Sequence, residues 1–420
     1  MALSLPISGQ VWVGKMIKKI TVLAIVFCLL LAVLSPILVQ AETELTVLES
    51  SAEANFPYSL NFKLEVESNV NITDIRLHYQ VDRDSFAQVT SEVLIKFIPD
   101  TSVAVSWTWD MIKSGGLPSG STIEYWWTVT DADDSRVETT PLQVQFNDER
   151  YNWLSLTEGD ITLYWYQGDE SFARQIMEAA QEALARLAID TGAHLERPVK
   201  VYIYASYDDL RGAMIFPQEW TGGAAYTTYG TVIIGINTGN LEWGKRTVVH
   251  ELTHLVTHQM TFNPYNNLPV WLNEGLSMYA EGEMEPTFEV YLRQAVLNDT
   301  LISVRSLASP FSAHAGKSYL SYAQSLSLVQ FLIDSYGQDK IFELLNAFKQ
   351  GSSYDGALIE VYGFDMDGLD ALWRDYIVEQ YQPATTDASS PAQAIKLSIL
   401  TTTLLLSSGM AAERCSWRRC

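Results

Sequence analysis

Cysteine is almost missing from this chain of 420 residues. Its three cysteines are Cys28, Cys415 and Cys420, so the long stretch between the two ends of the sequence carries no thiol. The body of the protein therefore has neither a disulfide framework nor a thiolate metal site.

Basic residues are also scarce, because 27 Lys and Arg stand against 50 Asp and Glu and give a formal net charge of −23. This balance argues against nucleic acid and anionic membrane surfaces as partners, since both attract cations. The simplest explanation is an acidic surface that keeps the protein soluble. Apolar residues make up 47% of the chain, which suffices for a sizeable core and for two or three domains.

An apolar run near the N-terminus covers residues 20–34. Lys15, Lys18 and Lys19 precede it. Residues 35–41 follow it and end in the small residue Ala41, after which cleavage is expected. This order predicts a secretory signal peptide over residues 1–41. The alternative is an N-terminal anchor that is not cleaved.

A second apolar run covers residues 397–412, and Arg418 and Arg419 follow it. A spanning helix needs about 20 apolar residues, whereas this run is shorter and contains serines and threonines. We expect residues 383–420 to be a linker that ends in either a membrane anchor or a frayed tail. Together with the signal peptide, these features predict a bacterial protein that is secreted or held at the extracellular face of the cell membrane.

Apolar and polar residues alternate in short runs within residues 43–147. The clearest runs are residues 60–66, 75–81, 103–109 and 123–129, with Gly, Pro and Asp between them. A period of two residues is typical of strands, so the pattern predicts an all-β immunoglobulin- or fibronectin-like sandwich.

Strands and helices are mixed in residues 150–382, after a junction at about residues 148–160. We expect strands at residues 161–166, 199–204 and 230–236, and helices at 170–187, 245–259 and 270–280. From residue 288 to residue 381 the period is helical, with Gly337, Gly351 and Gly363 as breaks. This order predicts an α+β domain.

Residues 250–254 read His-Glu-Leu-Thr-His. Positions i and i+4 share one face of a helix, so His250 and His254 can present two imidazoles to one metal ion. Glu251 lies one position further round, where it can reach a water bound to that metal. Glu274, twenty residues after the second histidine, is the expected third ligand. A His₂Glu set with an open fourth position is typical of catalytic zinc.

The alternative for these residues is an ordinary amphipathic helix with two unremarkable histidines. Apolar residues flank His250, Glu251 and His254 on both sides, which predicts a buried helix. Burial of two imidazoles and a carboxylate costs several kcal/mol unless they are paired or metal-bound. The metal site is therefore the favoured interpretation.

His-Glu-x-x-His followed at this spacing by Trp-Leu-Asn-Glu-Gly-Leu resembles the gluzincin metallopeptidases. The phrase is especially similar to the aminopeptidase N-like and peptidase MA-like domains, and the resemblance covers residues 150–380. It implies a thermolysin-like zincin fold with one Zn²⁺ per chain. Thermolysin-type enzymes carry an aspartate four residues after the glutamate ligand to orient a histidine. Here that position is Met278, so another group must orient the histidine.

The resemblance also implies a substrate-binding edge. In gluzincins the strand just before the metal helix is a sheet edge that binds substrate, and here that strand is residues 230–236. Gly222, Gly223 and Ala224 precede it and are the candidate substrate-binding residues, because glycine lets a substrate approach the backbone closely. The alternative is a flexible glycine-rich loop.

Hydrolysis also needs a donor for the oxyanion that forms on the attacked carbonyl. Related enzymes use a downstream tyrosine or histidine, and Tyr319 and Tyr322 are the candidates here. We favour Tyr322 because it opens the helical run 323–333. A core tyrosine is the alternative.

These residues predict an exported, zinc-dependent metallopeptidase that hydrolyses peptide bonds of a peptide or protein substrate. Glu251 would act as general base towards a zinc-bound water and then pass the proton to the leaving nitrogen. The alternative is a non-catalytic cell-surface binding protein on a peptidase-like scaffold, because a fold alone does not guarantee activity.

Overall fold

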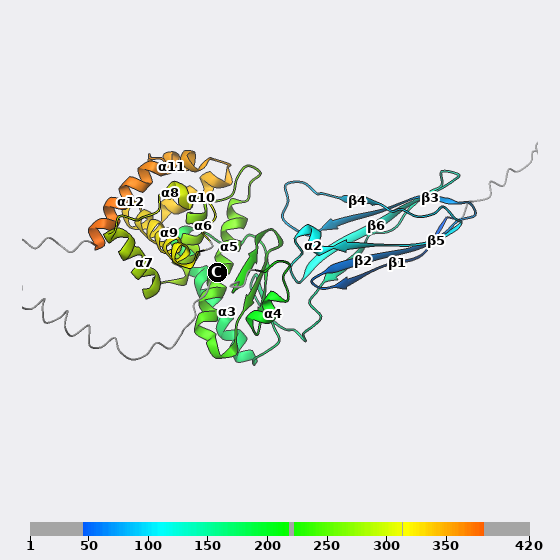
Figure 1. Cartoon of the computed structure of the whole chain (residues 1–420), viewed down its shortest axis with the longest axis horizontal. Helices are drawn as coiled ribbons and strands as arrows, with labels where there is room; N and C mark the ends of the chain where they lie inside the picture. The colour runs from blue at the N-terminus through cyan, green and yellow to red at the C-terminus, as the bar shows by residue number, and fades with distance from the viewer. Residues whose placement is uncertain (1–44, 218–221, 313, 382–420) are drawn as a thin grey trace, which may run out of the picture.

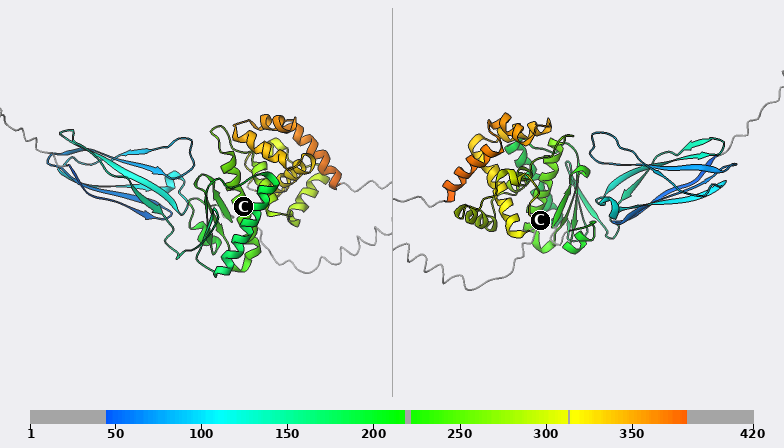
Figure 2. Two further views of the ribbon diagram at one scale, coloured as in Figure 1. Left: turned by 180° about the vertical axis from the view of Figure 1, so that it is seen from behind. Right: turned by 45° about the horizontal axis from the view of Figure 1, so that its top comes forward.

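The computed structural model describes residues 45–217, 222–312 and 314–381. They form an elongated molecule with a β part at one end and helices at the other (Figure 1). Two further views place a second sheet, drawn in green, between these ends (Figure 2). We refer to residues 45–147 as the β part and to residues 148–381 as the α+β part.

The β part consists of two antiparallel sheets, with strand orders β1-β2-β5 and β4-β3-β6-β7 and with β8 also paired to β6. Alternate residues of the strands point inward, so Phe62 and Leu64 of one sheet share a core with Leu77 and Trp127 of the other. The strands are β1 Thr46–Asn55, β2 Ser59–Glu67, β3 Ile72–Val81, β4 Ser91–Leu94, β5 Ser102–Asp110, β6 Ser121–Asp131, β7 Arg136–Glu138 and β8 Leu142–Phe146, and the short helix α2 is Met111–Ser114.

The four alternating runs of the sequence lie within β2, β3, β5 and β6. The expected β-rich N-terminal part is therefore present. Its assignment as an immunoglobulin- or fibronectin-like sandwich stays a prediction, as does the division of the chain at residues 43–147 and 150–382.

The second sheet has five strands in the order β12-β13-β11-β10-β9. Strands β10, β11 and β13 are parallel, while β9 and β12 run antiparallel at the two edges. The strands are β9 Leu154–Glu158, β10 Ile161–Trp165, β11 Val199–Tyr204, β12 Gly223–Tyr226 and β13 Thr231–Gly235. Residues 148–160, interpreted from sequence as a junction only, thus contain an edge strand.

Helices cover one face of this sheet and continue beyond it. Apolar residues of α3 and α5 pack on inward-facing strand residues such as Val201 and Ile234. The helices are α3 Glu170–Thr191, α4 Tyr207–Arg211, α5 Leu241–Thr261, α6 Val270–Glu281, α7 Pro286–Leu297, α8 Val304–Leu307, α9 Ala315–Tyr336, α10 Asp339–Lys349, α11 Tyr354–Tyr362 and α12 Met366–Tyr381, with short 3₁₀ helices η1 Thr227–Tyr229 and η2 Thr238–Asn240.

The expected helix breaks occur where the sequence placed them. Gly337 caps α9 and Gly363 caps α11, both at positive φ, 89° and 85°, and Gly363 is in the left-handed helical conformation. The third break, Gly351, follows α10 at φ 86°. The predicted α+β architecture of this part is therefore present.

Helices α6 and α9 approach each other closely at Gly275. A Cβ atom on this residue would lie 2.4 Å from the carbonyl oxygen of Ser325 and 2.7 Å from a methyl group of Val329. Only glycine fits this contact. Because Glu274 is the preceding residue, the same contact helps to set the position of its carboxylate along helix α5.

A buried aspartate anchors the connection between the two parts. The Asp148 side chain is fully buried, forms an ion pair with Arg150 at 2.6 Å, and accepts a hydrogen bond from the hydroxyl of Tyr204 at 3.0 Å. The indole of Trp153 donates to the Asp148 carbonyl. The chain therefore enters the α+β part through a fixed segment.

The targeting segments predicted from sequence, residues 1–41 and 397–412, lie outside the described residues. Within residues 45–217, 222–312 and 314–381, every helix is too short or too polar to span a bilayer.

Candidate metal centre

The metal helix α5 is buried on most sides, with Val248, Leu252 and Leu255 in the core. That packing leaves His250 and His254 one turn apart on a single face, with their ring centroids 4.8 Å from each other. Helix α6 runs past this face and carries Glu274.

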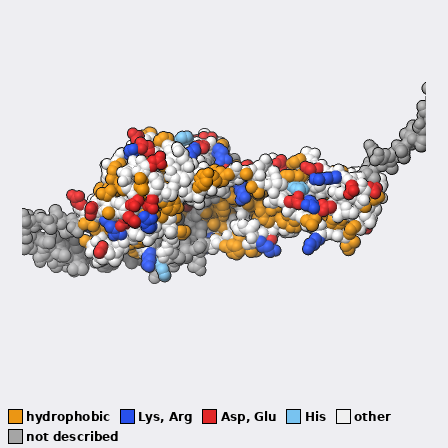
Figure 3. All heavy atoms as spheres, turned by 90° about the horizontal axis from the view of Figure 1, so that it is seen from above, with side chains coloured by type: hydrophobic (Ala, Val, Ile, Leu, Met, Phe, Trp, Pro, Cys, Tyr) orange, Lys and Arg blue, Asp and Glu red, His pale blue; other side chains and the backbone are white. Residues whose placement is uncertain are grey.

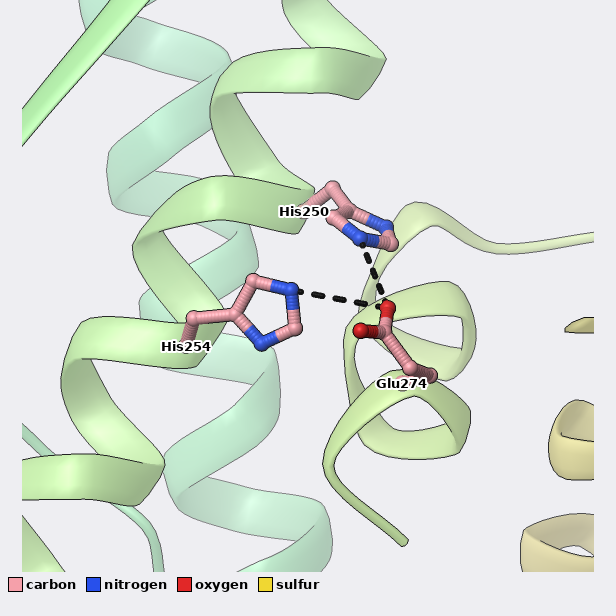
Figure 4. Close-up of side chains that lie close together, drawn as sticks. All are labelled: His250, His254 and Glu274. Atoms are coloured by element: carbon pink, nitrogen blue, oxygen red, sulfur yellow. Dashed lines mark ion pairs between the residues drawn. The ribbon is translucent and has the colours of Figure 1, made fainter. Parts of the chain in front are cut away.

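Three side chains converge between these helices. Glu274 Oε2 lies 3.3 Å from Nε2 of His250 and 3.6 Å from Nε2 of His254. One ligand atom from each residue lies within 4.8 Å of the other two. Figure 4 shows the two imidazoles on α5 and the carboxylate on α6 pointing towards one another. The structure thus brings together the three residues expected as metal ligands.

The cluster fits a metal ion on the chemistry of its donors. Glu274 Oε2 is buried and makes no well-aligned hydrogen bond, although two imidazole nitrogens face it. An unsatisfied buried carboxylate oxygen is costly, and a cation held by all three groups would satisfy it. Two imidazoles and one carboxylate are a common protein ligand set for catalytic zinc.

Each histidine has its own partner on the far side of the ring. Nδ1 of His250 donates to Glu281 Oε1 at 2.7 Å, since an ionised carboxylate only accepts hydrogen bonds. Nδ1 of His254 lies 3.1 Å from the hydroxyl oxygen of Ser277. Both contacts leave Nε2 facing Glu274, and a proton on each Nδ1 would give the tautomer that a metal ion needs.

Glu281 and Ser277 supply the orientation that Met278 cannot provide. The sequence alone did not identify them, although Glu281 lies seven residues after Glu274 and so on the same face of a helix. Glu281 is held in turn by Arg246, at 3.2 Å, and Arg246 also contacts Glu285 at 3.2 Å.

The charges of the cluster compensate one another. Burial lowers the pKa of His250, but the neighbouring carboxylates of Glu274 and Glu281 outweigh burial and raise this pKa well above its usual value. Burial raises the pKa of Glu274, and the neighbouring His254 and His250 lower it by more. A metal ion bound at Nε2 of His250 would therefore compete with a proton for this imidazole.

Glu251 lies on the side of α5 that faces strand β12. Its carboxyl group is buried, and burial raises its pKa, which suits a group that accepts a proton near neutral pH. A Cβ atom on Gly223 would lie 3.0 Å from Glu251 Oε1 and 3.3 Å from Glu251 Cδ. The glycine at this point of β12 therefore makes room for the carboxylate.

The predicted substrate-binding edge is wrong by one strand. Residues 230–236 contain β13, which lies inside the sheet between β11 and β12. The edge is β12 instead, in which Gly223 pairs with Ile234 and Ala224 with Ile233, while the Gly222 carbonyl accepts from Gly235 N at 3.0 Å. The reason is that the short Gly-Ala run has no apolar alternation, so the sequence pattern does not identify it as a strand.

The predicted oxyanion donor lies close to the metal cluster. The Tyr322 ring centroid is 6.5 Å from that of His250, and Phe288 and Phe311 pack around it. Tyr322 does not open the helix as expected, because α9 begins at Ala315 and the tyrosine lies two turns within it. Its role as a donor stays a prediction.

Two hollows of different character meet at the cluster. The hollow on the His250 side is mostly aromatic and apolar, and is lined by Trp243, Thr247, His250, Met278, Glu281, Glu285, Phe288, Ala315, Ser318, Tyr319 and Tyr322. The hollow on the His254 side, which we call the polar hollow, is lined mostly by residues with polar side chains, namely Thr227, Thr228, His254, Thr257, His258, Thr261, Phe262, Asn263, Asn266, Asn267, Leu268, Val270, Asn273 and Glu274. The cluster is therefore accessible from two sides.

Residues 179–379 match the family described as the Peptidase MA superfamily. This region is a Peptidase MA domain. The match includes α5 and α6 with all three candidate ligands, and it confirms the family that the His-Glu-x-x-His and Asn-Glu-Gly motifs indicate. The matched region is thus a metallopeptidase-like scaffold.

Several solved structures are similar to parts of the chain. OgpA from Akkermansia muciniphila, solved as an inactive form with an O-glycopeptide, has 10% identity and a TM-score of 0.20, over 26% of this chain and 30% of that one. Aminopeptidase A from Legionella pneumophila has 12% identity and a TM-score of 0.34, over 78% and 50%. An aminopeptidase N family protein from Idiomarina loihiensis has 10% identity and a TM-score of 0.27, over 81% and 73%.

The chain thus spans less than two thirds of the first two of these proteins. At such TM-scores the likenesses carry no weight for the fold or the activity. No curated protein matches the sequence.

Proposed function

We propose that the chain is a zinc-dependent metallopeptidase that hydrolyses peptide bonds. The observation that carries this proposal is the buried, unsatisfied oxygen of Glu274 between the Nε2 atoms of His250 and His254, with Glu251 beside it. Membership of the region in the Peptidase MA superfamily supports the same reaction class.

The residues divide the chemistry between them. His250, His254 and Glu274 would hold the zinc, which when bound polarises a carbonyl group and lowers the pKa of water. Glu251 accepts the proton of the attacking water and gives it to the leaving nitrogen. Glu281 and Ser277 keep the two imidazoles in the tautomer that exposes Nε2.

The free edge of β12 lies beside this chemistry. Among the described residues, only β13 pairs with β12, so its other side can add a substrate segment as a further strand. Gly223 places that edge against the Glu251 carboxylate. Tyr322, across the cluster on α9, is the proposed donor to the oxyanion.

The proposal includes the location of the protein. Residues 1–41 would direct export, and residues 397–412 would either anchor the chain or form a free tail. A reporter fused after residue 60 tests this, because export predicts its activity outside the cytoplasmic membrane and a cytoplasmic reporter would contradict it.

Metal analysis of purified variants tests the site. We expect about one zinc per chain in the wild type and a loss of zinc when His250, His254 or Glu274 is changed to Ala, because each change removes one of three ligands. Glu251→Gln is the matched control, since it should keep the zinc and lose most turnover. Full zinc occupancy in the His250→Ala/His254→Ala variant would contradict the assignment, and zinc without any peptide hydrolysis would favour a binding protein on this scaffold.

A further inference from the structure

A loop of the β part reaches the metal-binding helix. This 82–90 loop connects β3 to β4, and its Asp84 amide donates to the carbonyl of Thr228 at 2.7 Å. The Asp84 carboxylate forms an ion pair with Arg197 and lies 3.8 Å from Nε2 of His258. The side chain of Asp84 is only 6% exposed, so the loop is packed against the α+β part at this residue.

An aromatic pair extends the contact. Phe86 of the loop stacks on Phe262, with ring centroids 4.0 Å apart and an angle of 14° between the planes. Phe86 nevertheless remains 56% exposed, so part of its ring is available at the surface. In the view of Figure 3, hydrophobic side chains gather near the middle of the elongated molecule.

The residues that contact the 82–90 loop come from two elements, α5 and η1, that line the same hollow. His258 and Phe262 lie one and two turns beyond His254, at the end of α5. Thr228 belongs to η1, the turn that directly follows the edge strand β12. All three line the polar hollow that His254 and Glu274 also line.

We infer that the 82–90 loop positions the edge strand β12 relative to the metal helix α5, so that the β part completes the substrate-binding cleft. The inference deepens the proposed peptidase function and rests on it. Asp84 and Phe86 are positioning residues, because they act through Thr228, His258 and Phe262 and not on the reacting atoms.

A second contact shows that the loop is not the only attachment between the two parts. The Asp148 amide donates to the hydroxyl oxygen of Ser119 at 3.1 Å, and Lys200 Nζ donates to the carbonyl of Gly120 at 2.8 Å. Arg197, the partner of Asp84, is itself tied to α5, since its backbone amide donates to Gln259 Oε1 at 3.0 Å. The 82–90 loop therefore connects the β part to α5 and η1 in particular.

Variants of the full-length chain test the inference. Phe86→Ala removes the stacked ring and Asp84→Ala removes the ion pair, while Phe86→Tyr keeps the ring. Ile98→Ala is the matched control, because Ile98 is an exposed apolar residue of the β part, at 87% exposure. Its loop, between β4 and β5, accepts a hydrogen bond from Ile72 at the start of β3, whereas the 82–90 loop follows the end of β3. The probe is a quenched peptide that the wild type cleaves and that is long enough to span both hollows.

We expect Phe86→Ala and Asp84→Ala to raise KM by roughly two- to tenfold, the range for loss of one aromatic or charged contact, and to change kcat by less than about twofold. Zinc per chain should stay unchanged. Hydrogen exchange without substrate should quicken in peptides that cover residues 223–229 and 255–262. Phe86→Tyr and Ile98→Ala should match the wild type in every measurement.

The outcomes separate the loop from the chemistry. Unchanged KM and unchanged exchange in Phe86→Ala and Asp84→Ala would overturn the inference, and so would an equal change in Ile98→Ala. If Asp84→Ala does not fold, Phe86→Ala decides, because its ring is more than half exposed. If the wild type shows no chelator-sensitive cleavage, the proposed function fails, and the exchange measurement alone still decides whether the loop holds β12.

Discussion

Glu281 gives the most specific prediction about the metal centre. Its Oε1 accepts from Nδ1 of His250 at 2.7 Å, and its Oε2 lies 3.2 Å from the guanidinium of Arg246. Glu281→Ala removes the group that orients one ligand while it leaves all three ligands in place. Arg246 keeps Glu285 as a partner at 3.2 Å, so the variant creates no unpaired buried cation.

The expected loss is one of affinity for zinc. Removal of a carboxylate that orients a metal-ligating histidine costs about 10- to 100-fold in metal affinity or activity, or about 1.4–2.7 kcal/mol. Glu281→Gln should lose less, because an amide oxygen can still accept from Nδ1. Ser277→Ala is the matched change at His254 and should also lose less, since a hydroxyl is a neutral partner.

Competition with a chromophoric chelator measures these affinities directly. Thermal unfolding of the metal-free variants provides the control for folding. A zinc affinity of Glu281→Ala within about twofold of the wild type would refute the reasoning, because it would mean that the hydrogen bond to His250 does not orient the ligand.

Two further predictions follow from the same contacts. Gly275→Ala should destabilise the protein by about 1–3 kcal/mol, because its Cβ would lie 2.4 Å from the Ser325 carbonyl, and a thermal midpoint equal to that of the wild type would contradict the close packing of α6 on α9. Zinc affinity should rise with pH by about tenfold per unit, because zinc displaces the proton that the raised pKa of His250 retains. The stability of the protein without zinc should change with pH in the opposite direction. The raised pKa of His250 stabilises the folded state fully at low pH, and this stabilisation is lost as the pH rises through the pKa of His250 in the folded protein. A zinc affinity that does not change with pH in competition titrations would contradict the protonated state of His250.

The metal cluster could be predicted because its residues carry a helical spacing. His250 and His254 are four residues apart, so periodicity places them on one face of α5, and the motif that contains Glu274 indicates the third ligand. The same reasoning could not decide which groups orient the imidazoles. Glu281 and Ser277 become partners only through the angle at which α6 crosses α5, and a sequence does not contain that angle.

The fold was predictable wherever side-chain alternation was strong. Runs such as residues 60–66 and 123–129 alternate because one face of each strand packs on the core. Strand β12 was missed because Gly223, Ala224 and Ala225 give no such pattern, and its place depends on pairing with β13. The contact of the 82–90 loop with the α+β part could not be predicted from the sequence either, because Asp84 and Arg197 are far apart in it.

The digestion of a peptide library by the wild-type protein, read by mass spectrometry with and without a chelator, tests the central claim most directly. The account predicts internal or terminal cleavage that the chelator abolishes and added zinc restores, and no cleavage by Glu251→Gln. Cleavage that persists in the chelator, or in Glu251→Gln at the wild-type rate, would contradict it.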